Sequence, residues 1–277
     1  MTQIGQSSTE FTVEMPATRA TVTLAWAALT DVGHRREVNE DSVLVGAPIF
    51  AVADGMGGHS AGDVASAAVV TRLAEHVGKP GLDAQSIDAA LGQAVEDMKT
   101  GPGVTDQGTG TTVTGVALAA VSGKPSWIVF NIGDSRVYQL NAGVLEQVTT
   151  DHSVVQELFD AGRITREEAE VHPHGNIITR AVGFHEPPIP DYRILPLQAG
   201  MRILVCSDGL SKEITSYGIR HFLMSHPKVA DAADALVEAA LDNGGRDNVT
   251  VIVLDVLSVA EAPATIDDLL NASGGKN

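Results

Sequence analysis

Acidic residues stand at the end or the start of several short apolar runs that are typical of buried strands. In two places the run is followed directly by the dipeptide Asp-Gly. One Asp-Gly after a strand usually marks a turn, but five such acidic segments are poorly explained by turns alone. The acids concerned are Glu40 and Asp41, Asp54, Asp134, Asp208 and Asp247.

Carboxylates that meet in one cleft would repel one another. Two like charges about 4 Å apart cost about 1 kcal/mol in water and several times more where solvent is thin. Hard divalent cations relieve this repulsion, because oxygen ligands are those that Mg²⁺ and Mn²⁺ prefer. Gly55 and the glycines after it lack a Cβ atom, which lets backbone carbonyls and water approach such ions. If the strand ends meet, the pattern predicts a metal site.

Other chemistries fit the same segments less well. The glycine-rich stretch 54–62 has no Gly-Lys-Ser/Thr, and no G-x-G-x-x-G opens a helix, which argues against a phosphate-binding loop. No Cys-x5-Arg pattern follows Cys206, so a cysteine phosphatase is excluded. Ser207 has no evident histidine partner of the kind that activates a serine nucleophile. The metal interpretation is the one that remains.

The periodicity of the chain predicts the elements that must position these acids. Two helices come early, strands then dominate, and helices return late, which is not the strict alternation of a doubly wound sheet. Strands without intervening helices pair antiparallel. We therefore expect an α+β fold, a four-layer α-β-β-α sandwich of two mainly antiparallel sheets flanked by helices. The expected strands cover 21–29, 42–45, 49–53, 112–120, 127–131, 137–140, 201–206 and 249–256, and the expected helices 65–77, 87–98, 155–159 and 233–241.

The 277 residues suit a single domain with a substantial core. Residues 1–20 are polar and lack periodicity, so we expect a flexible lead-in there. The folded domain is expected at 21–258, followed by a C-terminal tail at 259–277 that ends in NASGGKN. No linker or repeat divides the region between them.

Charge and composition narrow the class of partner. The net charge of −17 disfavours nucleic acid and anionic membranes. A single cysteine, Cys206, excludes an intramolecular disulfide and fits a reducing compartment. The N-terminus has no basic segment of a secretory signal, and no apolar run approaches the ~18 residues of a membrane span. We expect a cytoplasmic protein without a nucleic-acid or membrane partner.

The acidic segments lie in motifs that resemble the metal-dependent protein phosphatases of the PPM (type 2C) family. Each motif alone is weak, but six in the family's order, across about residues 25–257, are specific. The second motif resembles the bacterial branch more than the eukaryotic one. The motifs are REVNED at 36–41, DGMGGH at 54–59, GTGTT at 108–112, GDSR at 133–136, SDGL at 207–210 and GRDN at 245–248.

The resemblance implies both a fold and a reaction. The family fold is a β-sandwich of two antiparallel sheets with helices on both sides, which agrees with the periodicity. The reaction is hydrolysis of phosphoserine and phosphothreonine in proteins. It uses two Mn²⁺ or Mg²⁺ ions, with room for a third, and a water that bridges the ions attacks phosphorus without a phosphoenzyme. The implied partners are phosphorylated proteins, namely bacterial serine/threonine kinases and their substrates, and a monomer is expected.

The family's roles transfer to matching positions of this sequence. Asp54 would bridge both ions and Gly55 would offer its carbonyl to one of them, with Glu40 beside that same ion. Asp208 and Asp247 would hold the other ion. The remaining implied positions are Asp134, which with Asp208 would hold a third ion, Arg36, which would bind the substrate phosphate, and Asp41 and Asn248, which would orient ligands and waters.

One position departs from the eukaryotic pattern. Eukaryotic members have a histidine directly after Asp-Gly that protonates the leaving group, and this chain has Met56 there. The candidates for general acid are then His59 and a metal-bound water. Two other functions stay open: a pseudophosphatase that acts as a binding module, disfavoured because no acid is missing, and another phosphoesterase, such as a small-molecule phosphomonoesterase.

Overall fold

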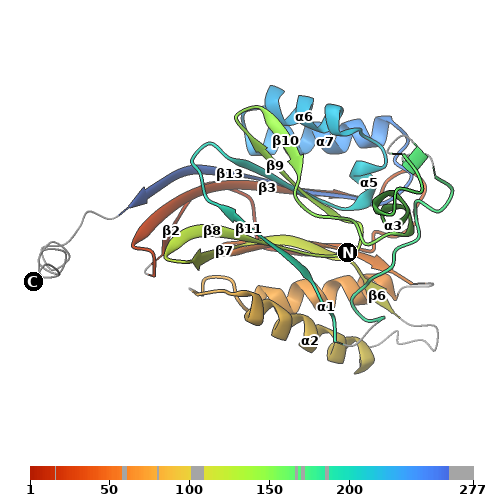
Figure 1. The fold of residues 1–277 in the computed structure, drawn as a ribbon, viewed down its shortest axis with the longest axis horizontal. Helices are drawn as coiled ribbons and strands as arrows, with labels where there is room; N and C mark the ends of the chain where they lie inside the picture. The colour runs from red at the N-terminus through yellow and green to blue at the C-terminus, as the bar shows by residue number, and fades with distance from the viewer. Residues whose placement is uncertain are drawn as a thin grey trace, which may run out of the picture.

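The computed structural model describes residues 1–15, 17–57, 61–79, 81–100, 109–165, 168–169, 172–184 and 187–261. Two sheets pack face to face, and helices lie on the outer side of each (Figure 1). The predicted four-layer α+β sandwich is therefore confirmed. Within the described residues, no helix is both long and apolar enough to span a membrane.

The first sheet carries the early acidic segments. Its strand order is β1-β4-β5-β7-β8-β11, with the short β6 paired to β5, and only the β1–β4 pair is parallel. Most of its strand residues are buried, because one face meets the second sheet and the other meets helices. The strands are β1 (Thr2–Ile4), β4 (Asp41–Gly46), β5 (Ile49–Met56), β6 (Gly110–Thr111), β7 (Val113–Val121), β8 (Lys124–Ile132) and β11 (Asp191–Pro196).

The second sheet is antiparallel throughout, in the order β10-β9-β12-β13-β3-β2. Its longest strands, β3 and β13, pair with each other, and their register shifts between Val256 and Ser258. The strands are β2 (Ser8–Met15), β3 (Ala20–Asp31), β9 (Arg136–Asn141), β10 (Val144–Gln147), β12 (Arg202–Cys206) and β13 (Val249–Glu261).

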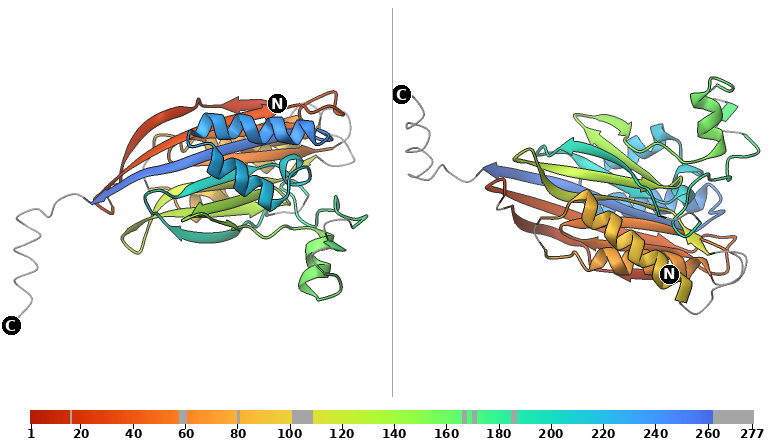
Figure 2. Two further views of the ribbon diagram at one scale, coloured as in Figure 1. Left: turned by 90° about the horizontal axis from the view of Figure 1, so that it is seen from above. Right: turned by 60° about the horizontal axis from the view of Figure 1, so that its bottom comes forward.

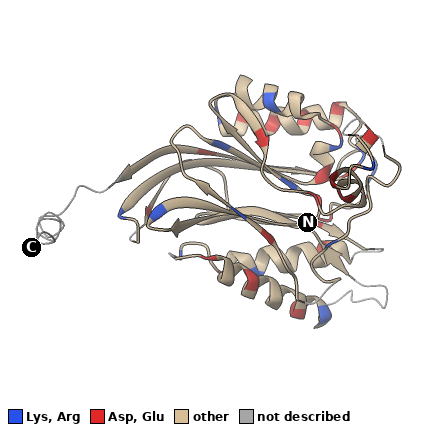
Figure 3. Ribbon diagram, in the orientation of Figure 1, with Lys and Arg blue, Asp and Glu red and all other residues tan. Residues whose placement is uncertain are grey.

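Amphipathic helices cover both outer faces, as two further views make clear (Figure 2). The first sheet is covered by α1 (Gly62–Ala74) and α2 (Ala84–Thr100), and the second by α6 (Ser216–Ser225) and α7 (Val229–Asp242). The one-turn α5 (Asp208–Ser211) follows β12, and α3 (Val154–Asp160) lies at the same end of the molecule. Charged residues lie mainly on the helices and near the strand ends (Figure 3).

Aromatic side chains join the two sheets in the central core. Trp26 of β3 contacts Phe50 of β5 edge to face with ring centroids 5.1 Å apart, and Phe50 contacts Trp127 of β8 at 6.2 Å. Phe50 and Trp127 are fully buried, and Trp26 is nearly so. Because such rings each bury a large apolar area, this stack fixes one sheet against the other and so places their acidic ends.

Two predicted boundaries are wrong. Residues 1–20 are not a flexible lead-in, because β1 pairs with β4 and β2 pairs with β3. β2 is an edge strand and most of its residues are exposed, but Phe11, Val13 and Met15 alternate with polar residues, and Val13 and Met15 pack against the core. The folded domain also extends past residue 258, since β13 ends at Glu261. The rest of the predicted tail lies outside the described residues.

Candidate active site

Both sheets bring their acidic ends to one place. Asp41 lies opposite Asp54 on the paired strands β4 and β5 of the first sheet. On the second sheet, Asp208 follows β12 and Asp247 precedes β13. A hydrogen bond links the two sheets at this point, since Thr250 Oγ1 donates to Asp41 Oδ2 over 2.6 Å. The structure thus groups acids that lie about two hundred residues apart in sequence.

The threonines of the GTGTT motif hold the backbone of Asp54. The Asp54 carbonyl accepts from Thr111 Oγ1 and from the Thr112 N–H, each over 2.9 Å. The Asp54 N–H donates to Thr112 Oγ1 over 3.1 Å. Thr112 Oγ1 also lies 2.9 Å from Ser135 Oγ, in the loop that carries Asp134. This motif therefore fixes two of the acidic loops together and leaves their carboxylates free to point elsewhere.

His152 holds the loop that carries Asp134 through the backbone of Gly133, and this role was not predicted from the sequence. Its Nδ1 accepts from the Gly133 N–H over 3.1 Å, and its backbone N–H donates to the Gly133 carbonyl over 2.9 Å. Because Nδ1 is the acceptor, the ring proton belongs on Nε2, which lies 3.2 Å from Asp191 Oδ2. Burial lowers the pKa of His152 and favours this neutral ring. Asp191 is 39 positions away, so no local pattern points to this contact.

Asn248 ties the segment before β4 to the start of β13. Its Oδ1 accepts from the Glu40 N–H over 2.8 Å. Its Nδ2 donates to the carbonyls of Val32 and Val38, over 2.9 and 3.1 Å. The side chain is buried, and these three bonds use it fully. Asn248 therefore positions the segment that carries Glu40 and Arg36.

The glycines of this region allow close packing of backbone. A Cβ atom on Gly55 would lie 2.1 Å from the Gly62 carbonyl oxygen and 2.6 Å from that of Glu40. A Cβ on Gly209, just after Asp208, would lie 2.0 Å from the Asn248 carbonyl oxygen. No real Cβ tolerates such distances. Beyond any access they give to ions, these glycines let the acidic segments approach one another.

The carboxylates share a poorly solvated space. Burial raises the pKa of Asp41 and of Asp134, each to about 7. Burial, followed by the charges of Asp41, Asp208 and Asp134, raises the pKa of Asp54 well above its ordinary value. Burial also raises the pKa of Glu40. Negative charge is disfavoured here unless a cation accompanies it.

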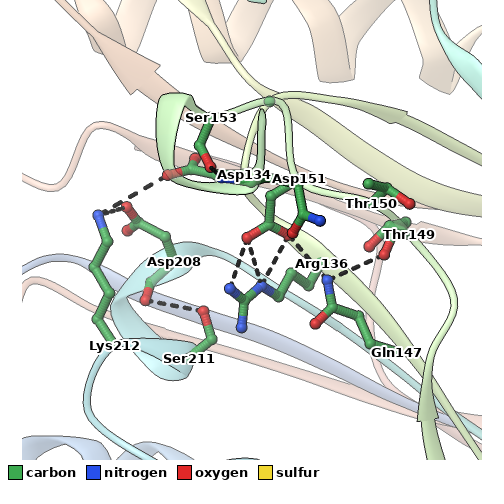
Figure 4. Close-up of polar contacts among 12 residues, drawn as sticks. Asp134, Arg136, Gln147, Thr149, Thr150, Asp151, Ser153, Asp208, Ser211 and Lys212 are labelled. Carbon is green, nitrogen blue, oxygen red and sulfur yellow. Dashed lines mark hydrogen bonds and ion pairs between the residues drawn. The ribbon is translucent and has the colours of Figure 1, made fainter. Parts of the chain in front are cut away.

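Two cationic side chains reach this group. Arg36 Nη2 donates to Asp247 Oδ2 over 2.8 Å, and this bond is the main reason that the pKa of Arg36 is raised. The Lys212 ammonium contacts Asp208 Oδ2 and lies 4.0 Å from Asp134 Oδ2 (Figure 4). Burial lowers the pKa of Lys212, but the charges of Asp208 and Asp134 outweigh it and the pKa is raised. Lys212 was not singled out in the sequence, although its spacing of four from Asp208 places the two on one helical face.

The residues fit divalent cations by their chemistry. Asp41 Oδ1 and Asp208 Oδ1 are buried, and neither has a hydrogen-bond partner among the described residues. Buried carboxylate oxygens without partners are costly unless a cation neutralises them. Among the residues that the structure describes, no three Asp, Glu, His or Cys side chains form a closed ligand set. The fit therefore rests on the donor types and on the two unpartnered oxygens.

Not every predicted site residue can be placed. Most of the predicted residues come together at one end of the two sheets, namely Glu40, Asp41, Asp54, Gly55, Asp134, Asp208, Asp247 and Asn248. Arg36 lies at the exposed rim of this group, where 52% of its side chain is accessible. His59 lies outside the described residues, so its role as general acid stays a prediction. The structure likewise leaves the assigned metal-ligand roles as predictions.

Comparisons with known proteins match this chain to protein phosphatases. The model of the family described as protein phosphatase 2C matches residues 33–244. The chain is 44% identical over 246 residues to the serine/threonine protein phosphatase PstP of Mycobacterium tuberculosis (strain CDC 1551 / Oshkosh), covering 86% of this chain but 46% of PstP. It is 35% identical to the serine/threonine phosphatase stp of Listeria monocytogenes serotype 4b (strain F2365), covering 82% of this chain and 93% of that one.

A solved structure gives the same result at the level of the fold. The catalytic domain of the serine threonine protein phosphatase PstP, solved in complex with two manganese ions, superimposes with a TM-score of 0.76 at 41% identity. The match covers 86% of this chain and 99% of that one. The chain spans less than half the length of the full PstP protein that it matches.

Proposed function

The chain belongs to the protein phosphatase 2C family, and from this premise we propose that it is a metal-dependent phosphatase that hydrolyses phosphoserine and phosphothreonine in proteins. One observation carries the proposal: the buried acids of both sheets converge at one end of the sandwich, where the pKa of Asp54 is raised and an oxygen of Asp208 has no hydrogen-bond partner among the described residues. The names of the M. tuberculosis and L. monocytogenes relatives support the substrate class.

Two Mn²⁺ or Mg²⁺ ions would be held by this chain's acids. Asp54 with the Gly55 carbonyl and Glu40 would hold one ion, and Asp54 with Asp208 and Asp247 the other. When bound, such ions supply positive charge against the phosphoryl oxygens and a hydroxide-like nucleophile near neutral pH. The two manganese ions in the PstP catalytic domain support the number and kind of ion.

Arg36 binds the phosphoryl group of the substrate. Its guanidinium is half exposed, and Asp247 holds it in place through one nitrogen. A guanidinium has further N–H groups, and parallel donors of this kind suit a phosphate. Asn248 fixes the backbone segment from which Arg36 extends. Asn248 therefore supports both Arg36, which binds the substrate phosphate, and the acidic cluster.

Water, and not a side chain, attacks phosphorus. Ser207 Oγ is buried and accepts from the Thr250 N–H over 3.0 Å, and Ser135 Oγ is buried against Thr112. Burial raises the pKa of the Cys206 thiol to about 12, so that it stays protonated and unreactive. The water oxygen bonds to phosphorus as the bond from phosphorus to the substrate oxygen breaks, and the freed serine or threonine takes up a proton. No phosphoenzyme forms.

The partners we propose are bacterial serine/threonine kinases and the proteins that they phosphorylate, and we propose action in the cytoplasm as a monomer. A pseudophosphatase is the second candidate. It is disfavoured because all the predicted acidic ligands and Arg36 are present. A small-molecule phosphomonoesterase is the third, and a comparison of substrates separates it from the first.

The test is phosphate release from a phosphothreonine peptide, measured with Mn²⁺, with Mg²⁺ and with EDTA. Wild type is compared with Asp54→Ala and with Asp234→Ala, which removes an exposed acid of α7. We expect Mn²⁺-dependent release that is lost in Asp54→Ala and kept in Asp234→Ala. A folded wild type that releases no phosphate with either metal would refute the proposal. Turnover of p-nitrophenyl phosphate without turnover of the peptide would favour the small-molecule enzyme.

A further inference from the structure

Lys212 places a positive charge inside the acidic cluster. It follows α5 directly, and its N–H donates to the Asp208 carbonyl over 2.8 Å, so that the helical turn brings its side chain back over Asp208. The ammonium contacts Asp208 Oδ2 and lies 4.0 Å from Asp134 Oδ2 (Figure 4). About a third of the side chain, 35%, is exposed, so the ammonium lies at the margin of the buried cluster.

Asp134 precedes β9 and Asp208 follows β12, two strands that pair in the second sheet, and both acids are nearly buried. Their side chains are 9% and 12% exposed. Two anions so placed need a neighbouring positive charge. Among the described residues the other nearby cations are engaged elsewhere, since Arg36 binds Asp247 and Arg136 binds Asp151 over 2.6 Å. Lys212 is thus the cation that serves this pair.

The two oxygens of Asp208 face different surroundings. Oδ2 contacts the Lys212 ammonium, whereas Oδ1 is buried with no hydrogen-bond partner in the part of the chain that the structure describes. One oxygen thus belongs to the lysine, and the other remains for a ligand. A carboxylate divided in this way can bind one metal ion through Oδ1 while its second oxygen stays with the chain's own cation.

We propose that the Lys212 ammonium is the resident cation of the Asp134–Asp208 pair and prevents a metal ion from binding between these two carboxylates. The inference rests on the proposed function, which assigns Asp208 to one of two ions. The family resemblance implies a third ion between Asp134 and Asp208. In this chain the Lys212 ammonium occupies that position instead. The chain then works with two metal ions and one fixed ammonium, and Lys212 sets this stoichiometry.

The expected size of the effect follows from the distance. An ion held by Asp134 and Asp208 would lie within a few ångströms of the ammonium. At about 4 Å, each unit of charge changes a binding constant about fivefold in bulk water, and by more where water is excluded. Removal of the lysine charge should therefore strengthen binding at this pair about 25-fold or more for a divalent ion about 4 Å away.

The experiment counts ions without reference to activity. The full chain is stripped with EDTA, and Mn²⁺ binding is measured by titration calorimetry and by electron paramagnetic resonance of free Mn²⁺. Wild type should bind two ions, and Lys212→Gln should gain a third. Lys228→Gln, which removes an exposed lysine before α7, should behave as wild type. The double variant Lys212→Gln/Asp134→Asn should lose the gained ion, which assigns it to this pair.

Two results would overturn the inference. One is an equal number and affinity of ions in wild type and in Lys212→Gln. The other is a third ion in wild type that Asp134→Asn removes. If Lys212→Gln does not fold, as judged by circular dichroism, Lys212→Met keeps the aliphatic stem and replaces it in the same titration. Ion counts decide the role of Lys212 whether or not phosphate is released, so failure of this inference and failure of the proposed function are distinguishable.

Discussion

Replacement of Asp41 by asparagine should flatten the pH dependence of stability in the metal-free protein. The side chain is fully buried, accepts a hydrogen bond from Thr250 and lies opposite Asp54. Burial is the main cause that raises its pKa from 3.8 to about 7. This difference corresponds to about 4 kcal/mol of free energy between the protonated and the charged side chain. Because the Asp41 side chain is fully buried, solvent does not screen this free-energy difference.

The sign follows from proton binding. Because the folded-state pKa lies above the unfolded one, the folded protein keeps a proton on Asp41 that the unfolded chain has released. This contribution to stability is complete below an unfolded pKa of about 3.9, and it is lost as the pH rises through a folded pKa of about 7. Between those values, the free energy of unfolding should fall by about 1.4 kcal/mol per pH unit for this single proton.

The assay is urea unfolding in EDTA at several pH values from about 5 to about 6.5, inside that window. Wild type also carries the raised pKa values of Asp134 and Asp54, so its slope exceeds that of one proton. In Asp41→Asn the slope should be smaller by about 1.4 kcal/mol per pH unit, whereas Asp234→Asn on the exposed face of α7 should match wild type. An unchanged slope in Asp41→Asn would show that Asp41 is already ionised in the folded protein and would refute the reasoning.

Four further outcomes are expected. Arg36→Ala should lower kcat/KM for a phosphothreonine peptide about 10- to 100-fold, the value of a charge-assisted hydrogen bond, and phosphate release at limiting peptide measures this; a change below about twofold would contradict it. Arg202→Met should cost about 3–5 kcal/mol in urea unfolding, because it leaves the partly buried Asp255 and three backbone carbonyls unpaired, whereas Glu96→Gln, which breaks an exposed pair with Lys99, should cost about 1 kcal/mol or less. Native Cys206 should resist iodoacetamide near pH 8 and react after unfolding, since its pKa is raised to about 12; labelling of the folded protein would disprove this. Mn²⁺ should raise the unfolding temperature more at about pH 8 than at about pH 5, because the ligands must be ionised to bind it; the reverse order would count against a carboxylate site.

The central strands could be predicted because their runs of apolar residues are typical of strands buried on both faces. The run 49–53 lies within β5, and 249–256 lies within β13, where continuous apolar residues face packed layers on both sides. Edge strands gave no such signal. β11 alternates only weakly and depends on backbone pairing with β8, whereas β2 alternates at Phe11, Val13 and Met15 but lies in a polar stretch that obscures this signal.

The same distinction applies to the site. Asp54 and Asp208 could be singled out because strand, acid and glycine are adjacent in sequence. His152 could not, since its role comes from Gly133 and Asp191, which only the folded chain brings to it. Lys212 was visible in principle through its spacing from Asp208. Its contact with Asp134 depends on the pairing of β9 with β12, strands about 70 residues apart, which the local pattern does not specify.

The site's longest-range contacts place a condition on biosynthesis. Arg36 with Asp247, Glu40 with Asn248 and Asp41 with Thr250 each join positions more than two hundred residues apart. A nascent chain emerges from its N-terminus and folds as domains become complete. Arg36, Glu40 and Asp41 therefore leave the ribosome early. Their contacts with Asp247, Asn248 and Thr250 can form only after the start of β13 has been synthesised. Until β13 is translated, the growing chain lacks three of the contacts that assemble the proposed active site.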